Sequence, residues 1–158
     1  MEIAVVEEII FMGKQKIPWK DVEQYLKKYV GQVYIVSKSR DRIHIGGGFP
    51  DEYSESAYTK KLRGGLAKAK ANAAQVIGKM IEIADNKRWV ENKDPKHRKE
   101  ASRGWYRYDT RFSVPVQGSE EKGKRQNVFR ATLVVRSSDH GLYLYDVINI
   151  KKEASTPL

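Results

Sequence analysis

The chain has 158 residues, and its 30 Lys and Arg against 20 Asp and Glu give a formal net charge of +10. Such a charge favours a polyanionic partner such as nucleic acid. The lack of cysteine excludes disulfides, thiolate metal sites and thiol nucleophiles. No apolar run approaches the roughly 20 residues of a membrane span, and the acidic start does not resemble a signal peptide. We therefore expect a cytoplasmic protein without a membrane partner.

Residues 1–46 are predicted to form a small N-terminal strand-helix-hairpin unit. Apolar residues within 3–17 favour one or two short strands. Pro18 then opens a helix whose apolar residues recur at helical spacing, and Gly31 supplies a left-handed stop. Residues 32–45 alternate apolar and polar side chains on both sides of a polar turn, which predicts a hairpin.

A turn-rich segment at 46–51 marks the boundary to a second domain, which spans residues 47–158. Its glycine run is not followed by Lys-Ser or Lys-Thr at P-loop spacing, so a phosphate loop is disfavoured. Apolar positions at helical spacing predict a helix over 66–84. Five polar residues of this helix are expected to point to solvent: Lys68, Lys70, Asn72, Gln75 and Lys79.

The remainder of the chain is predicted to be rich in strands. Residues 86–103 are polar and strongly charged, which is typical of an exposed loop or short helix. Three segments with two-residue alternation follow at 104–116, 127–136 and 142–150. The expected fold class is α+β, with helices packed on one face of an antiparallel β-sheet and a small N-terminal unit.

The strand after Arg103 interleaves arginines with large aromatic side chains. The two-residue period assigns Trp105, Arg107 and Arg111 to one face. With the two later strands, the inward face is expected to hold Tyr106, Tyr108, Phe112, Phe129, Leu133, Val135, Leu142 and Leu144. The outward face is expected to gather Arg107, Arg111, Arg130, Arg136, Tyr143 and Tyr145.

This outward face predicts binding of single-stranded nucleic acid, RNA rather than DNA. Guanidinium groups bind phosphate bidentately, and flat rings stack on unpaired bases. The plain alternative is a half-buried strand with a solvated charged side. Adjacent guanidiniums repel each other unless acidic groups or a polyanion neutralise them. This repulsion favours the hypothesis that the face binds nucleic acid.

His97 is the candidate general acid or base for RNA cleavage without a metal, because it lies among Lys96, Arg98 and Lys99. The alternative is an exposed loop histidine. Arg107 and Arg111 are the candidate clamp on the phosphorane, and Tyr145 is expected to orient or protonate. Phosphate or base contacts are assigned to Trp105, Arg130, Arg136, Tyr143, Lys96 and Arg98. No metal ligands and no cofactor are expected.

Several blocks resemble the large polyvalent protein-associated domains of phages and conjugative elements of Gram-positive gut bacteria. The resemblance covers roughly residues 40–158, and its second half is the more specific part. The blocks are Phe49-Pro50-Asp51-Glu52-Tyr53, Lys68 to Ala73, Met80 to Ala84, Gly104 to Asp109 with Arg111-Phe112, Asn127-Val128-Phe129, and Leu144 to Glu153.

The resemblance implies a domain of a multidomain protein whose partners include other domains of that protein. The resemblance also implies that a phage or conjugative element delivers the protein into a host cell. Neighbouring families in such proteins have been assigned to the fold of the barnase, EndoU, colicin and RelE nucleases. Two functions follow: a metal-independent endoribonuclease, or a non-catalytic nucleic-acid or protein-binding module. Whether His97 lies within reach of the arginines discriminates between them.

Overall fold

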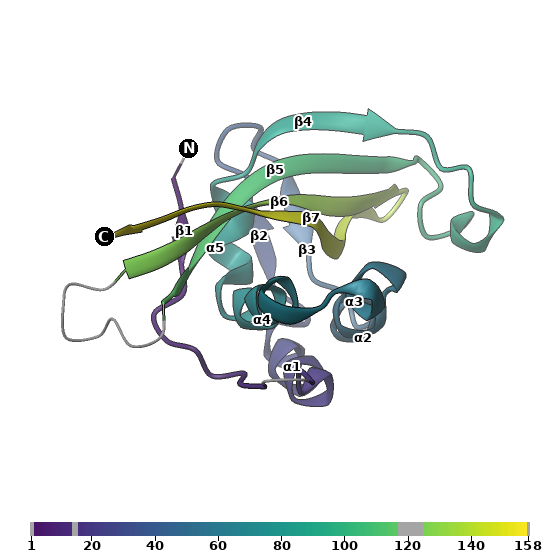
Figure 1. Ribbon diagram of the computed structural model, residues 1–158. Coiled ribbons are helices and arrows are strands. Elements are labelled where there is room, and N and C mark those ends of the chain that lie inside the picture. The colour runs from purple at the N-terminus through teal and green to yellow at the C-terminus, as the bar shows by residue number, and fades with distance from the viewer. Residues whose placement is uncertain (1, 14–15, 117–124, 158) are drawn as a thin grey trace.

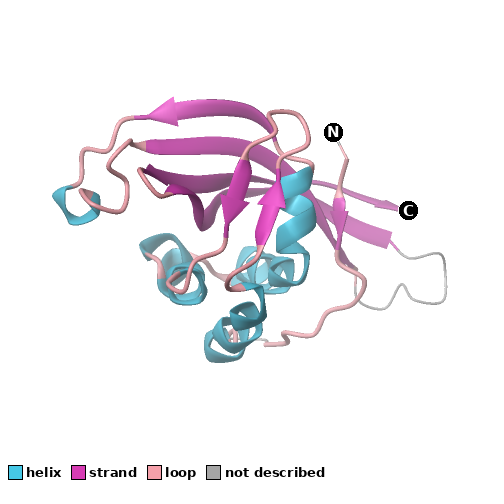
Figure 2. Ribbon diagram, turned by 180° about the vertical axis from the view of Figure 1, so that it is seen from behind, coloured by secondary structure: helices cyan, strands magenta, loops and turns pink. Residues whose placement is uncertain are grey.

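In a computed structural model that describes residues 2–13, 16–116 and 125–157, the chain forms a curled mixed sheet with helices on one side (Figures 1 and 2). The described residues form seven strands in the order β1-β5-β6-β7-β3-β2, with β4 paired to β5. The strands are β1 (Ala4–Val5), β2 (Val33–Ile35), β3 (Arg42–His44), β4 (Asp85–Val90), β5 (Trp105–Pro115), β6 (Arg125–Ser138) and β7 (Gly141–Pro157). The predicted α+β class is confirmed.

Five α-helices are described on the inner side of this sheet. They are α1 (Trp19–Leu26), α2 (Phe49–Glu55), α3 (Ala57–Lys61), α4 (Gly64–Ala73) and α5 (Ile77–Glu82). In Figure 1, α2 to α4 lie between the sheet and α1, which packs against α2. Short 3-10 turns follow α1 and α4, and a third precedes β5.

The three long antiparallel strands have the predicted division of faces over β5, over most of β6 and in β7 as far as Leu144. Tyr108 and Phe112 of β5 are fully buried, and they lie opposite Leu133 and Phe129 of β6. Leu144 of β7 is buried in the same core, against the helices. The apolar and aromatic residues at every second position therefore form one continuous apolar layer, and the predicted register is correct for these residues.

The N-terminal segments join this sheet. The hairpin of β2 and β3 forms as predicted and pairs in parallel with the start of β7, through Ile43 and Leu142. Strand β1 pairs in parallel with β5 at Phe112, so residues from both ends of the sequence share one sheet.

Two predictions about local structure were wrong. Residues 85–90 form β4, an edge strand on β5, where a loop or short helix was expected. Lys70 and Asn72 of α4 are fully buried, although both were expected to face solvent. The reason is that α4 is covered on several sides, since the N-terminal segment crosses it. The Asn72 side chain accepts hydrogen bonds from the backbone N–H of Ile10 and of Phe11, at 3.0 and 3.1 Å.

The free edge of β7 beyond its contact with β3 is covered by the α2–α3 region. The backbone N–H of Ile150 donates to the hydroxyl of Tyr58 at 2.8 Å, where a neighbouring strand would otherwise supply a carbonyl. Covering an edge in this way satisfies its backbone and blocks pairing with other chains. It also brings α2 and α3 next to the part of β7 that carries Tyr145 and Asp146.

Candidate nucleic-acid interface

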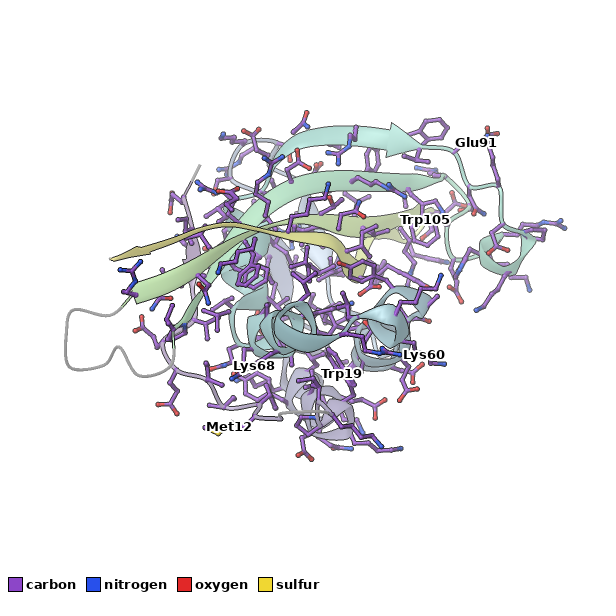
Figure 3. All side chains as sticks on the ribbon, viewed as in Figure 1. Met12, Trp19, Lys60, Lys68, Glu91 and Trp105 are labelled. Carbon is purple, nitrogen blue, oxygen red and sulfur yellow. The ribbon has the colours of Figure 1, made fainter. Side chains whose placement is uncertain are left out.

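An aromatic pocket of about 250 Å³ lies at the end of the sheet where β5 begins. We use the name aromatic pocket for the cavity lined by Val90, His97, Trp105, Arg107, Val134, Tyr145, Asp146 and Ile148. Figure 3 places Trp105 here, at the start of β5 and near the connection that follows Glu91. The pocket combines flat rings with one guanidinium, which are the groups that bind an unpaired base.

His97, the candidate general acid or base, packs into this pocket, so it is not the exposed loop histidine of the alternative. Its ring lies edge-on to Trp105 and to Tyr145, with centroid distances of 5.2 and 5.3 Å. The residue is only 9% exposed, and its Nδ1 lies 3.3 Å from a carboxylate oxygen of Glu100. Glu100 therefore fixes one ring nitrogen and leaves Nε2 as the nitrogen available for a ligand.

A β-bulge explains how Tyr145 reaches His97. Val135 pairs with Leu144 and Val134 pairs with Asp146, so Tyr145 is the extra residue between two regular pairs. A bulge bends the strand and redirects the side chains at that point. Burial, and then a hydrogen bond with Glu52, raise the pKa of Tyr145 above its ordinary value, so its phenol stays protonated at neutral pH.

Arg107 connects the aromatic pocket to the rest of the outer sheet face. It lies opposite Val134 on β6 and opposite Arg88 on β4. Its Nε atom is buried and has no hydrogen-bond partner among the described residues. A buried donor of this kind is unfavourable unless a ligand or water accepts from it.

A second, polar depression of about 610 Å³ continues along the outer face, and we name it the arginine basin. Its charged lining consists of the cations Arg88, Arg111, Arg130 and Lys151 and the carboxylates Asp109 and Glu153. Lys151 lies two residues after Asn149. Asn149 has a backbone φ of 52° and belongs to a second bulge in β7. The basin thus has an excess of positive charge at a place where the sheet is bent.

Ion pairs partly neutralise the basin. Arg111 Nη2 lies 2.5 Å from Glu153, and Arg130 Nε lies 3.5 Å from the same carboxylate. Arg88 Nη2 lies 3.0 Å from Asp109. These pairs are partly exposed, so each contributes little to stability, and phosphate oxygens can compete for the same guanidiniums.

Arg136 and Tyr143 form a third group, away from both depressions. The Arg136 guanidinium lies over the Tyr143 ring at 5.0 Å, and that ring stacks on His44 at a centroid distance of 5.0 Å. Lys96 and Arg98 are exposed on either side of His97. The structure thus brings together His97, Trp105, Arg107 and Tyr145, places Arg111 and Arg130 in the adjacent basin, and leaves Arg136 and Tyr143 apart.

A buried ion pair below the aromatic pocket was missed by the sequence argument. Lys70 Nζ lies 2.6 Å from Asp146 Oδ1 and donates to Thr59 Oγ1, also at 2.6 Å. Burial lowers the pKa of Lys70 and raises that of Asp146. The available signal was the position of Lys70 between Ala69 and Ala71, because small apolar neighbours indicate close packing around this lysine.

Two further observations bound the chemistry of the described residues. No group of three or more His, Asp or Glu side chains among them is arranged to hold a metal ion. None of the helices seen here is long and apolar enough to cross a membrane. Comparisons with protein families, with curated proteins and with solved structures find no significant match.

Proposed function

We propose that this protein binds single-stranded nucleic acid, RNA in preference to DNA, on the outer face of β5 to β7. In this proposal the aromatic pocket takes an unpaired base and the arginine basin takes the phosphates that follow it. The observation that carries the proposal is the position of Arg107, which lines the pocket and lies on the strand that leads into the basin. Unpaired, splayed bases are the usual target of sequence-dependent RNA binding.

The distances along β5 support an extended ligand. Arg107 and Arg111 are four residues apart on one face, which corresponds to about 13 Å at the rise of a β-strand. This spacing leaves room for more than one phosphate between them. The edge-on rings of Trp105 and Tyr145, at a centroid distance of 5.1 Å, offer flat surfaces at the other end.

The resemblance to polyvalent protein-associated domains supports the same proposal from a different direction. In this proposal, the chain acts in the cytoplasm as one unit of a phage or mobile-element protein. Its partners are then nucleic acid and the other domains of that protein. Residues 1–46 form the smaller unit of this arrangement, and residues 47–158 form the larger one.

Replacing both Arg107 and Arg111 with alanine is expected to weaken RNA binding and to flatten its salt dependence. Each phosphate that a cation neutralises releases counterions, so losing two contacts lowers the slope of log K against log salt by up to about two units. Fluorescence anisotropy with a labelled single-stranded RNA, titrated at several salt concentrations, measures this slope.

The matched control removes the same charge from the helical side. Lys20 of α1 and Lys27, the first residue of the 3-10 turn after α1, are both exposed. Alanine at these two positions should lower the slope by clearly less than the arginine pair does. If the two double variants have equal slopes, the binding surface is not the outer sheet face.

RNA cleavage is the second candidate function, and it is favoured by the contact of His97 with Tyr145 beside Arg107. His97 would take the proton of the 2′-hydroxyl through Nε2 while the 2′-oxygen forms a bond to phosphorus. Arg107 would stabilise the negative charge on the phosphorane oxygens, and the 5′-oxygen would leave as its bond to phosphorus breaks and take its proton from water. Because the Tyr145 phenol has a raised pKa and bonds to Glu52, its role here is to hold the His97 ring in place. In the alternative, a non-catalytic binding module, the same residues bind RNA but no proton is transferred and the RNA is not cleaved.

A further inference from the structure

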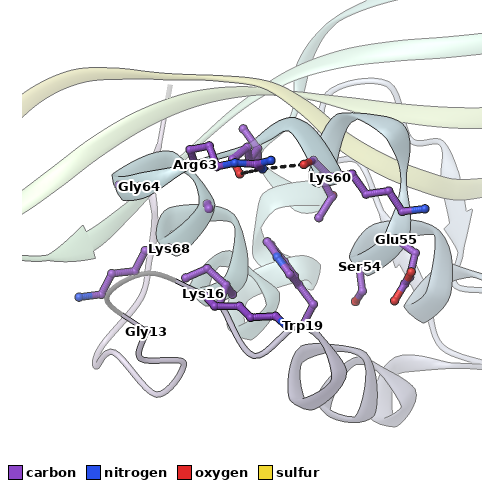
Figure 4. A pocket seen from close by; sticks show the side chains of 14 residues that line it. Gly13, Lys16, Trp19, Ser54, Glu55, Lys60, Arg63, Gly64 and Lys68 are labelled. Carbon is purple, nitrogen blue, oxygen red and sulfur yellow. Dashed lines mark hydrogen bonds between the residues drawn. The ribbon is translucent and has the colours of Figure 1, made fainter.

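A separate cavity of about 560 Å³ opens on the helical side of the molecule (Figure 4). Its walls come from the segment before α1, from Trp19, from the end of α2, from α3 and from the first turn of α4. No residue that lines the aromatic pocket or the arginine basin lines this cavity. Its volume lies within the range of about 300–1,000 Å³ typical of small-molecule sites.

One end of the cavity is strongly cationic. Lys16, Lys60, Arg63 and Lys68 all line it (Figure 4), and Arg63 directly precedes α4 while Lys68 lies in the second turn of α4. Arg63 Nη1 donates to the carbonyls of Lys60 and Leu62, at 2.6 and 2.7 Å. These bonds hold the guanidinium at the corner between α3 and α4, so its charge is fixed in place before any ligand arrives.

The first turn of α4 adds backbone donors at the same end. The helix has ten residues and begins without a side-chain cap. A Cβ built on Gly64 or on Gly65 would meet no atom within 4 Å, so the backbone there is open to a ligand. Uncapped N–H groups at a helix start carry a partial positive charge and bind phosphate oxygens.

The cavity wall formed by α2 has a different character. Ser54 is only 3% exposed, and its buried Oγ has no hydrogen-bond partner among the described residues. The adjacent Glu55 places a carboxylate in the same wall. A hydroxyl and a carboxylate bind sugar hydroxyls well, whereas the carboxylate repels a second phosphate. The indole of Trp19 contributes a flat apolar surface to the lining.

We propose that this cavity binds a nucleoside monophosphate. The phosphate lies at the start of α4 against Lys16, Lys68 and the glycine N–H groups. The base stacks on Trp19, and the sugar hydroxyls bond to Ser54 and Glu55. Because Glu55 opposes further negative charge, the site takes one phosphate rather than a strand of nucleic acid.

Isothermal titration calorimetry of the full chain with a nucleoside monophosphate tests this site. The matching nucleoside and inorganic phosphate are expected to bind at least about tenfold more weakly, since each lacks contacts to charged or aromatic groups. Lys68→Ala should weaken nucleotide binding about tenfold, and Ser54→Ala should weaken it by a smaller factor. Lys27→Ala, at an exposed position of the 3-10 turn after α1, should leave it unchanged.

The alanine pair at Arg107 and Arg111 separates this site from the proposed RNA interface, because it should bind the nucleotide as the parent chain does. No detectable heat with the nucleotide would overturn the proposal. Equally tight binding of inorganic phosphate and of the nucleotide would also overturn it. The same holds if Lys68→Ala binds the nucleotide as the parent chain does while circular dichroism confirms its fold.

Discussion

Lys70→Met is expected to lower the free energy of unfolding by about 3–5 kcal/mol, because it leaves the Asp146 carboxylate buried without its cation. Lys70 is fully buried, and the side chain of Asp146 is 6% exposed. The methionine keeps most of the apolar stem, so the loss reports the charge rather than a cavity. Chemical denaturation monitored by circular dichroism measures the change.

Two controls identify the cause of this loss. Lys79→Met removes an exposed lysine whose partner is Glu2, and it should change stability by no more than about 1 kcal/mol. Combining Lys70→Met with Asp146→Leu removes both charges and should recover most of the stability lost by the single change. A Lys70→Met variant as stable as the parent chain would mean that the pair contributes nothing.

His97→Ala is expected to reduce RNA cleavage by roughly a hundredfold or more while RNA binding persists, since proton transfer by one group typically contributes 10² to 10⁴. The products should end in a cyclic phosphate, and a chelator should not inhibit their formation. Gel separation of a labelled oligonucleotide, with mapping of the 3′ ends, gives both the rate and the chemistry.

His140 offers the matched control, because it lies exposed in the turn between β6 and β7. His140→Ala should cleave as the parent chain does. Full activity in His97→Ala would exclude His97 as the proton-transfer group. Binding without any cleavage by the parent chain would leave the non-catalytic module as the function.

The two-residue period predicted the long strands well because nothing interrupts it over β5 and most of β6. Tyr108, Phe112 and Leu133 lie in the core as the alternation requires. In β7 the period fails after Leu144, where the bulge at Tyr145 shifts the alternation and Val147 becomes buried. A bulge depends on the pairing of two strands, so one strand's sequence does not reveal it.

The errors on α4 and β4 have the same origin in tertiary contacts. Lys70 and Asn72 are polar, so a helical projection assigns them to solvent, yet each has a dedicated buried partner far away in the sequence. Residues 85–90 are charged, but an edge strand tolerates charge because it exposes one side. The local sequence of α4 or of β4 does not indicate which distant residues will contact it.

The grouping of the candidate site was predictable only in part. Arg107 and Trp105 share a face because they are two residues apart, and the sequence predicts this directly. The approach of His97 to Tyr145 depends on the turn at Pro95–His97 and on the bulge in β7, which are set by the folded chain. Glu52, which forms a hydrogen bond with Tyr145, lies in α2. This helix was not predicted, because the glycine-rich segment before it indicated a turn.

Single-stranded RNA is proposed to lie on the outer face of β5 to β7. Ultraviolet crosslinking of the protein to a uridine-rich oligonucleotide, followed by mass spectrometry of the digested peptides, tests this most directly. We expect crosslinks on Trp105 and Tyr145 of the aromatic pocket, and we expect them to be lost when Arg107 and Arg111 are both replaced with alanine. Crosslinks confined to Trp19 and Tyr25 of α1 would contradict it.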